Sequence, residues 1–236
     1  MHRHLDTLLT AEKVGTSFPP YQATYSFPDE YIDDFHSIIG CSAKGSGLIN
    51  LDHAFGFSLK GWLRRADALK LYELAYFAEG DILELGSYHG LSTCILAKAV
   101  HNARRGTRIL SVDLSAANST KTTESLQPLG LERLVTTVCS EATAAVKNLA
   151  EKRRRFAFVF IDHSHSFRPV YQVCRHLPTV LNSCAFCLFH DFNDRRNGDP
   201  AYPQYGVYQA VLDGLDRELF DFYGVYGCTA LYRARS

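Results

Sequence analysis

The chain carries five runs of mostly apolar residues, separated by stretches in which apolar positions recur at helical spacing. The apolar runs cover residues 81–85, 108–114, 134–140, 156–162 and 185–191. Runs of this length and character are typical of strands that are covered on both faces of a sheet. The intervening stretches predict helices over residues 91–101, 120–129, 141–150 and 167–181. Alternating strands and helices predict a doubly wound α/β fold with parallel strands.

The C-terminal segment has a different pattern. Residues 219–223 and 229–233 are strand-like and flank a turn that contains Gly224 and Gly227. This arrangement predicts a final antiparallel pair at the edge of the sheet. We therefore expect a Rossmann-like sheet of seven strands, mostly parallel, with a C-terminal antiparallel pair.

Residues 61–78, ahead of the first strand, have the pattern of an amphipathic helix. The positions expected to pack on the sheet are Trp62, Ala66, Leu69, Tyr72 and Tyr76. The charged positions expected to lie mostly elsewhere are Arg64, Arg65, Lys70 and Glu73. We assign this helix to core packing over the first strand, with no chemical role.

The first 50 residues are less regular, so we divide the chain into an N-terminal arm or cap (1–50) and one α/β domain (51–236). Residues 17–28 are rich in Pro, Tyr, Phe and Thr, and residues 29–39 are compatible with a short helix. Two interpretations stay open. The segment is either a loose arm, or a cap over the substrate or a dimer contact.

Composition agrees with one folded domain. Of 236 residues, 46% are hydrophobic, and acids and bases balance at 25 each. That balance argues against bulk electrostatic binding of nucleic acid or of an anionic membrane. No apolar run approaches a membrane span, and the first residues lack the apolar core of a signal peptide. We expect a cytoplasmic protein that forms a homodimer or higher homo-oligomer.

The seven cysteines are scattered. Cys184 and Cys187 are the nearest to a C-x-x-C pair, but they lie inside an apolar run. We interpret the cysteines as small buried hydrophobic residues in a reducing compartment, not as a disulfide framework or a zinc site.

The segment 80–93 combines a predicted strand, a glycine-hinged turn and the start of a helix. Gly86 and Gly90 permit a tight turn, which points a helix N-terminus at a ligand over the strand's carboxyl end. Nucleotide-like ligands bind there in open α/β sheets. A dinucleotide site requires a second glycine where this chain has Tyr88, so the turn disfavours a pyrophosphate.

Two acids favour a different ligand. Glu84, just before the turn, suits a ligand with an ammonium group, and Asp113, which ends the next strand, can accept hydrogen bonds from both ribose hydroxyls. An adenosine that bears an amino acid and no phosphate fits both, and this describes S-adenosylmethionine. The alternative is a structural strand–turn–helix joint with two solvated acids.

The motif Glu84-x-Gly86-Ser87-x-x-Gly90-x-Ser92-Thr93, followed by Asp113, resembles the first two motifs of class I S-adenosylmethionine-dependent methyltransferases. Residues 160–166 and 188–192 resemble the domain-24 family of small methyltransferases. That family is similar to macrocin-type sugar O-methyltransferases, to cephalosporin hydroxylase-like proteins and, more distantly, to catechol O-methyltransferase. The likeness extends from about residue 51 to the C-terminus.

The resemblance implies a set of cofactor contacts. They are Glu84, Gly86, Ser87, Tyr88, Gly90, Ser92, Thr93, Asp113, Ser140, Glu141 and Asp162. Ser140 and Glu141 stand where these enzymes contact the adenine, although capping of the following helix explains them equally well.

Asp162 and Asp191 close the fourth and fifth strands. Because neighbouring parallel strands lie about 5 Å apart, two carboxylates at their ends can hold one divalent cation. Oxygen ligands suit Mg²⁺, Mn²⁺ or Ca²⁺ better than zinc, and we expect Mg²⁺ or Mn²⁺. In the related enzymes an acid also ends each of these strands.

The third ligand stays open, because the second acid of the catechol enzyme is followed by Asn, whereas this chain has Phe192. We take His190 as the ligand, with Asn193 and Asp194 as alternatives. A histidine ligand would shift the preference toward Mn²⁺ or Fe²⁺.

His165 is our candidate for the general base, because a histidine can take a hydroxyl proton near neutral pH. A histidine at this offset from the metal acid is implicated as base in the macrocin-like enzymes. His163 is an alternative ligand or a packed residue. We count Asp162 with His165 as catalytic.

These features predict a divalent-metal-dependent O-methyltransferase that acts on a small hydroxylated acceptor: a sugar, a phenol or a natural-product intermediate. A metal-free N- or O-methyltransferase is one alternative, and a non-methylating cofactor-binding accessory protein is another. Residues 193–206, which follow Asp191, are expected to form either a substrate lid or an irregular connection.

Overall fold

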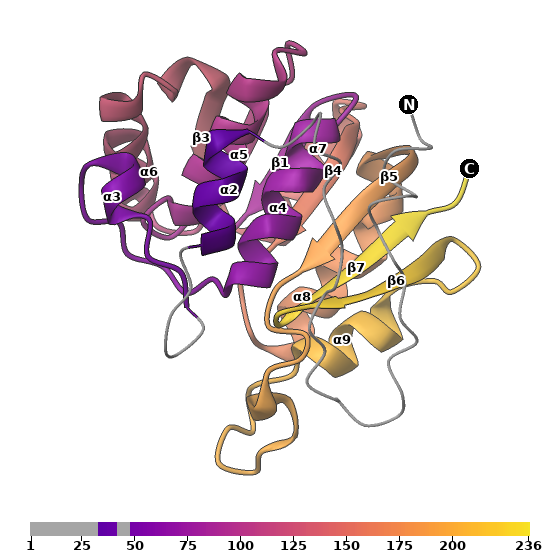
Figure 1. Ribbon diagram of the computed structural model, residues 1–236. Helices are drawn as coiled ribbons and strands as arrows, with labels where there is room; N and C mark the ends of the chain where they lie inside the picture. The colour runs from indigo at the N-terminus through magenta and orange to yellow at the C-terminus, as the bar shows by residue number, and fades with distance from the viewer. Residues whose placement is uncertain (1–32, 42–47) are drawn as a thin grey trace.

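The computed structural model describes residues 33–41 and 48–236. Its centre is a seven-stranded sheet in the order β3-β2-β1-β4-β5-β7-β6 (Figure 1). The strands are β1 (Ile82–Leu85), β2 (Ile109–Asp113), β3 (Val135–Cys139), β4 (Phe156–Ile161), β5 (Leu181–Phe189), β6 (Phe220–Tyr226) and β7 (Thr229–Ala234). Strands β1 to β5 pair in parallel, and β7 pairs antiparallel with both β5 and β6. The predicted fold is confirmed.

Helices cover both faces of the sheet. They are α2 (Asp34–Cys41), α3 (Asp52–Phe55), α4 (Arg65–Phe77), α5 (Leu91–Ala103), α6 (Ala116–Leu126), α7 (Ala142–Glu151), α8 (Phe167–His176) and α9 (Val207–Gly214). Short 3₁₀ turns are η2 (Gln127–Leu129), η3 (Glu132–Leu134), η4 (Leu177–Val180) and η5 (Arg195–Gly198). Side chains of α2, α4 and α5 share one hydrophobic cluster with the sheet, and those of α7, α8 and α9 share the other.

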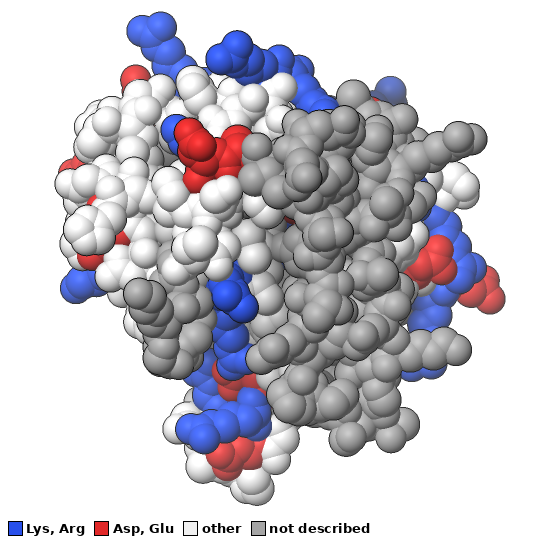
Figure 2. All heavy atoms as spheres, in the orientation of Figure 1, with Lys and Arg blue, Asp and Glu red and all other residues white. Residues whose placement is uncertain are grey.

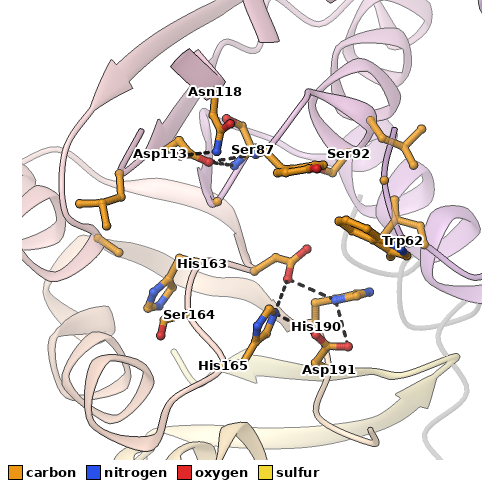
Figure 3. Close-up of a pocket in the computed structure, with 18 of the residues that line it drawn as sticks. Trp62, Ser87, Ser92, Asp113, Asn118, His163, Ser164, His165, His190 and Asp191 are labelled. Atoms are coloured by element: carbon orange, nitrogen blue, oxygen red, sulfur yellow. Dashed lines mark hydrogen bonds and ion pairs between the residues drawn. The ribbon is translucent and has the colours of Figure 1, made fainter. Parts of the chain in front are cut away.

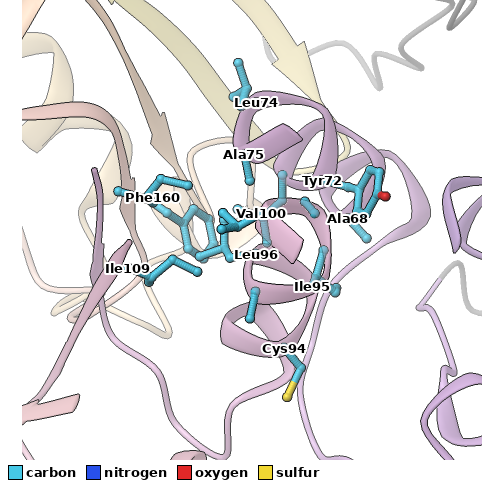
Figure 4. Close-up of a cluster of buried hydrophobic side chains, with 14 of the residues drawn as sticks. Ala68, Tyr72, Leu74, Ala75, Cys94, Ile95, Leu96, Val100, Ile109 and Phe160 are labelled. Carbon is cyan, nitrogen blue, oxygen red and sulfur yellow. The ribbon is translucent and has the colours of Figure 1, made fainter. Parts of the chain in front are cut away.

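The first of these clusters is drawn in Figure 4, where side chains of α4 and α5 meet Ile109 of β2 and Phe160 of β4. Along β1 the side chains alternate between the clusters, because Ile82 belongs to the first and Leu83 to the second. Each large apolar side chain buried in this way contributes about 1.5–3 kcal/mol to stability. Burial on both faces explains why the central strands are almost wholly apolar.

Strand β3 departs from the prediction that every strand is covered on both faces. Val138 and Cys139 of β3 are exposed, and Val135 is only partly buried. The strand order explains the difference, because β3 lies at the edge of the sheet and has β2 as its one neighbouring strand.

The helix predicted over residues 61–78 begins later, at Arg65, and its buried face was predicted only in part: Tyr72 is buried as expected, but three other positions differ. Trp62 is 64% exposed and precedes the helix, whereas Lys70 and Glu73 are both 0% exposed. Nζ of Lys70 lies 2.6 Å from Oε2 of Glu73, and it also lies over the ring of Tyr226, 4.3 Å from its centroid. The two charges compensate each other, so a pattern based on residue type places them on the wrong side of the helix.

Several boundaries also shift. Helix α6 starts at Ala116, before the predicted residue 120, because the Ser115 side chain accepts a hydrogen bond from the Asn118 backbone and caps it. Helix α8 ends at His176 rather than at residue 181, since Pro178 interrupts the helical hydrogen bonds. Residues 181–184 therefore join β5. Helix α9 was not predicted.

Part of the predicted N-terminal arm packs on the domain. The helix expected at 29–39 lies at α2, where Phe35 and Ile39 are buried in the core beside α4. The side chain of Asp33 accepts hydrogen bonds from Tyr72 and Asn102. Residues 17–28 lie outside the described residues. The division into an arm and a domain stays a prediction.

Two surface properties bear on the sequence expectations. On the face drawn in Figure 2, charged side chains of both signs are interspersed among uncharged ones over the described residues. Among those residues, no helix has both the length and the apolar character needed to cross a membrane.

Candidate functional site

A cavity of about 840 Å³ opens at the carboxyl ends of the parallel strands (Figure 3). Its walls come from the turns that follow each of these strands. The lining includes Gly86, Ser87 and Tyr88 after β1, Asp113 and Ser115 after β2, Ser140 and Glu141 after β3, Asp162, His163 and His165 after β4, and His190 and Asp191 after β5. Residues predicted from five separate segments therefore meet in one cavity.

The turn after β1 has the conformation that its glycines require. Gly86 has φ 97° and Gly90 has φ 92°, both in the left-handed region. A Cβ at Gly86 would overlap the backbone carbonyl of Asp162, so β1 and β4 approach each other closely here. Helix α5 begins directly after Gly90, with its first N–H groups next to the cavity.

Glu84 is fully buried and takes part in building this turn. Its carboxylate accepts hydrogen bonds from the hydroxyls of Ser92, Thr93 and Ser111, each at 2.6 Å. Glu84, Gly90 and Thr93 are not among the residues that line the cavity. Burial raises the pKa of Glu84 to about 7, although the three hydroxyl hydrogen bonds lower it. Its predicted contact with a ligand ammonium stays a prediction, while its hydrogen bonds hold β1, β2 and α5 together.

We expect Glu84→Gln to flatten the pH dependence of the free energy of unfolding. The folded-state pKa of about 7 is above the ordinary value of 4.5, so the folded protein binds the Glu84 proton more tightly than the unfolded chain does. The resulting stabilisation is fully present at a pH below 4.5. It is lost as the pH rises through about 7, by on the order of 3 kcal/mol at about 1.4 kcal/mol per pKa unit. Urea unfolding between about pH 5 and pH 8 measures the loss. Glu124→Gln, at an exposed position of α6, is the control. An equal loss in Glu84→Gln and wild type would contradict the prediction.

Asp113 faces the cavity and holds the turn. Oδ2 accepts hydrogen bonds from the backbone N–H groups of Ser87 (3.1 Å) and Tyr88 (2.9 Å). Oδ1 accepts from the Ser115 backbone (2.9 Å) and the Asn118 side chain (3.0 Å). Because a carboxylate has about four acceptor positions, a ribose hydroxyl would have to share one of these.

Ser140 and Glu141 line the cavity, and Glu141 has the capping role that the sequence left open. Its carboxylate accepts hydrogen bonds from the backbone of Thr143 (2.9 Å) and Ala144 (2.7 Å) at the start of α7. Burial tends to raise the pKa of Glu141, but the backbone hydrogen bonds outweigh it and lower the pKa. The adenine contact of this pair stays a prediction.

Two carboxylates and two imidazoles converge between the ends of β4 and β5. Nε2 of His165 lies 3.0 Å from Oδ2 of Asp191 and 3.8 Å from Oδ1 of Asp162. Nδ1 of His190 lies 3.2 Å from Oδ1 of Asp162 and 3.5 Å from Oδ1 of Asp191. Asp191 has φ 58°, a conformation that Asp and Asn tolerate better than other side chains. The predicted metal acids and both predicted histidines therefore form one cluster.

The four groups shift one another's pKa values. Hydrogen bonding to Asp162 and Asp191 raises the pKa of His165 to about 9. Burial would lower the pKa of His190, but the charge of Asp162 raises it well above its ordinary value. Burial would raise the pKa of Asp191, yet the neighbouring imidazoles of His165 and His190 lower it. The two acids therefore attract positive charge to this point.

The alternative ligands are placed less favourably. Asp194 is held by Arg196, whose Nε and Nη2 lie 2.8 and 3.0 Å from its carboxylate oxygens. Asn193 is not among the residues that line the cavity. His163 lines it, but Nε2 is buried without a hydrogen-bond partner among the described residues, and burial lowers the pKa to about 4.

The segment 193–206 contacts the cluster through Tyr205. The rings of Tyr205 and His165 are nearly parallel, with centroids 5.2 Å apart. The guanidinium of Arg196 lies 4.4 Å from the centroid of the Tyr205 ring. The backbone N–H of Gly206 donates to the carbonyl of His165 at 2.8 Å. This part of the segment holds His165 in place, whereas Tyr202 is exposed. A lid function stays a prediction.

Sequence reasoning missed several cavity residues. Trp62 lines the cavity, and its ring lies 5.2 Å from that of Tyr88. Asn118 lines it from α6, and Cys228 reaches it from the β6–β7 turn. The cysteine interpretation is also corrected, because Cys41 and Cys139 are exposed and Cys228 lies 3.4 Å from Nε2 of His190. These residues lie outside the motifs at the strand ends, and nothing in the sequence around them indicates that they approach the cavity.

Comparison with known proteins agrees with these observations. Residues 83–192 match the family model described as a methyltransferase domain. No curated protein matches the sequence.

Solved structures of methyltransferases share the fold. The SAH-bound methyltransferase PaMTH1 of Podospora anserina is 14% identical, and the alignment covers 92% of this chain and 100% of that one with a TM-score of 0.61. The O-methyltransferase TomG of Streptomyces achromogenes, involved in tomaymycin synthesis and solved with SAM, is 16% identical over 87% of this chain and 91% of its own (TM-score 0.56). An O-methyltransferase of Bacillus cereus in complex with SAH is 16% identical over 71% and 78% (TM-score 0.54).

Proposed function

We propose a function for this protein from the premise that residues 83–192 form a class I, S-adenosylmethionine-dependent methyltransferase domain. The proposed reaction is transfer of the methyl group to a hydroxyl oxygen of a small acceptor. Asp162, Asp191 and His190 would hold a divalent cation, and His165 would act as general base. The acceptor class is a sugar, a phenol or a natural-product intermediate.

The observation that carries the metal proposal is the environment of His190. Its Nδ1 is buried, points toward carboxylate oxygens of two acids, and has no described group in hydrogen-bond geometry with it. In the neutral imidazole, which is the form that binds a metal, a lone pair on Nδ1 directed at two carboxylates is unfavourable unless a positive charge lies between them. Asp162, His165 and Asp191, whose possible ligand atoms all lie within 4.8 Å of one another, support a cation between the two acids.

The donor set favours some cations over others. Two carboxylates suit Mg²⁺ or Mn²⁺, and an imidazole moves the preference toward Mn²⁺ or Fe²⁺. When bound, such a cation supplies positive charge that lowers the pKa of a coordinated hydroxyl. The residues present therefore fit a divalent cation.

Residues of the chain would bind the cofactor, orient the acceptor and accept its proton. The Gly86–Gly90 turn, Asp113 and the start of α5 bind the adenosine and amino-acid parts of S-adenosylmethionine, which supplies the methyl group. Asp162 and Asp191 orient the acceptor hydroxyl beside it. Such positioning converts a bimolecular reaction into an effectively unimolecular one.

His165 is placed to receive the proton of the acceptor hydroxyl. It is the more exposed histidine of the cluster, with 46% of its side chain accessible against 5% for His190. Its pKa of about 9 would keep it protonated at neutral pH, so it can act as a base only when the charges of Asp162 and Asp191 are neutralised. Nε2 then takes the hydroxyl proton as the acceptor oxygen displaces the sulfonium sulfur at the methyl carbon.

The cofactor part of the proposal has its own test. S-adenosylmethionine should raise the melting temperature, and NAD should not. Asp113→Ala should weaken S-adenosylmethionine binding at least tenfold, because a hydrogen bond to a charged group is worth about 1.5–3 kcal/mol. Isothermal titration calorimetry measures the change. Unchanged affinity would remove Asp113 from the cofactor site.

The whole proposal is tested by the release of S-adenosylhomocysteine with hydroxylated acceptors, in the presence and absence of a chelator. Turnover that survives chelation would favour the metal-free N- or O-methyltransferase. Cofactor binding without turnover of any acceptor would favour the accessory protein. A homo-oligomeric state stays a prediction.

A further inference from the structure

A second polar group lies behind His190, on the side away from Asp162. Cys228 Sγ lies 3.4 Å from Nε2 of His190 and 3.6 Å from Oδ2 of Asp67. Nε2 of His190 lies 3.9 Å from the same Oδ2. All three residues are buried, and Asp67 is 1% exposed. They come from α4, from the end of β5 and from the β6–β7 turn.

Asp67 is already committed to protein donors. Its Oδ1 accepts hydrogen bonds from the backbone of Cys228 (2.8 Å) and the hydroxyl of Thr229 (2.7 Å). Its Oδ2 accepts from the backbone of Arg64 at 2.8 Å. A Cβ at Gly227 would overlap the Asp67 carboxylate, so the β6–β7 turn is built closely around it. With three strong hydrogen bonds, Asp67 has one acceptor position left, and it faces Cys228.

The remaining hydrogen bonds run in one direction, from His190 through Cys228 to Asp67. Because a carboxylate oxygen can only accept, the thiol of Cys228 donates to Oδ2 of Asp67, which leaves its sulfur to accept from an Nε2–H of His190. Sγ also lies 3.8 Å from Oδ1 of Asp191, a longer contact. In the neutral ring, which is the form that binds a metal, a proton on Nε2 leaves Nδ1 with its lone pair, and Nδ1 is the atom that faces Asp162 and Asp191.

We propose that Cys228 and Asp67 are positioning residues, which fix the ring orientation and tautomer of His190 so that Nδ1 is presented as a metal ligand. This inference rests on the proposed metal site. Metal-binding histidines commonly donate their second N–H to an outer group, and the loss of that group typically costs 10–100-fold in metal affinity. Here the outer group is the Cys228 thiol, which in turn donates to the buried carboxylate of Asp67. Both residues act through His190 and not on the substrate.

The test is the Mn²⁺ affinity of the full chain, measured from the electron paramagnetic resonance signal of free Mn²⁺. Cys228→Ala removes both the acceptor and the donor, and should weaken binding by about 10–100-fold. Cys228→Ser keeps an O–H that can accept from Nε2 and donate to Asp67, so it should restore most of the affinity. Cys187→Ala, at a buried thiol of β5 with an apolar environment, is the matched control and should bind Mn²⁺ like wild type.

Several outcomes would overturn the proposal. One is Mn²⁺ binding by Cys228→Ala within about twofold of wild type, and another is an equal loss in Cys187→Ala, which would indicate a general packing effect. If wild type itself binds no Mn²⁺, both the metal part of the proposed function and this inference fail. If wild type binds and Cys228→Ala is unaffected, the inference alone fails.

Direct ligation by the thiol is separated by spectroscopy. With Co²⁺ in place of Mn²⁺, a sulfur-to-cobalt charge-transfer band would show that Cys228 coordinates the metal, and this would overturn the positioning role. We expect no such band. Asp67→Asn keeps the shape of the side chain and should also weaken Mn²⁺ binding. Asp67 also supports the β6–β7 turn, so Asp67→Asn could fail to fold. In that case the comparison of Cys228→Ala with Cys228→Ser still tests the positioning role.

Discussion

Asp191→Asn should lower methyl transfer by roughly 10³-fold, because the cation that neutralises charge at the acceptor oxygen contributes several kcal/mol. Asn is the appropriate replacement, since Asp191 has φ 58° and Asn tolerates this backbone conformation whereas Ala does not. The change removes the negative charge and keeps the shape. Asp162→Asn should behave in the same way.

Binding of S-adenosylmethionine should stay within about twofold of wild type in Asp191→Asn, because we place this carboxylate at the acceptor and not at the adenosine. A larger loss of binding in Asp162→Asn would indicate the cofactor contact that the sequence predicts for Asp162. Calorimetry measures this binding, and the rate of S-adenosylhomocysteine release measures turnover. Asp221→Asn is a matched control, since Asp221 is an exposed carboxylate on β6, paired with Arg235. Full activity of both cavity variants in the presence of a chelator would mean that the acids are structural.

His165→Gln should lower turnover by about 10²–10⁴-fold, the usual cost of removing a general base. Glutamine keeps hydrogen-bonding capacity and approximate size but cannot accept a proton at neutral pH. The pH–rate profile is the discriminating measurement. With the cation bound, the wild-type rate should rise with pH through a limb that lies below the metal-free pKa of about 9, and the variant should lose this limb.

Mn²⁺ affinity decides between two roles for His165, whose Nε2 is close enough to both acids to be a ligand itself. A base predicts nearly unchanged Mn²⁺ affinity in His165→Gln, whereas a ligand predicts a large loss. His101→Gln, at an exposed position of α5, is the control. A His165→Gln variant that keeps both the rate and the limb would move the role of base to His163, to His190 or to the metal-bound hydroxyl alone.

The strands and the strand–turn–helix motif could be predicted because their signals are local. A strand buried on both faces must be apolar along its length, as β4 is, and a turn that brings β1 against Asp162 requires glycine at position 86. The pairing of Asp162 with Asp191 was also predictable. Each acid follows a parallel strand, and these strands end at the same edge of the sheet.

The orientation of helix α4 could not be predicted in this way. A periodicity argument places Lys70 and Glu73 in solvent, because isolated charges are costly to bury. In the structure the charges of Lys70 and Glu73 compensate each other in the core. Trp62, which was expected to pack on the sheet, lines the cavity. Such compensation depends on which two side chains meet, and no single position reveals it.

The amino-acid sequence by itself determined the class of fold, the turn that follows β1, and the identity of the acids and histidines at the ends of β4 and β5. These follow from hydrophobic period, backbone conformation and the geometry of parallel strands. Only the tertiary structure decided that Glu84 is committed to three hydroxyls, that Tyr205 stacks on His165, and that Asp67 and Cys228 lie behind His190. These contacts join residues as far apart as α4 and the β6–β7 turn. They exist because packing of the whole chain brings those elements together, which local patterns do not encode.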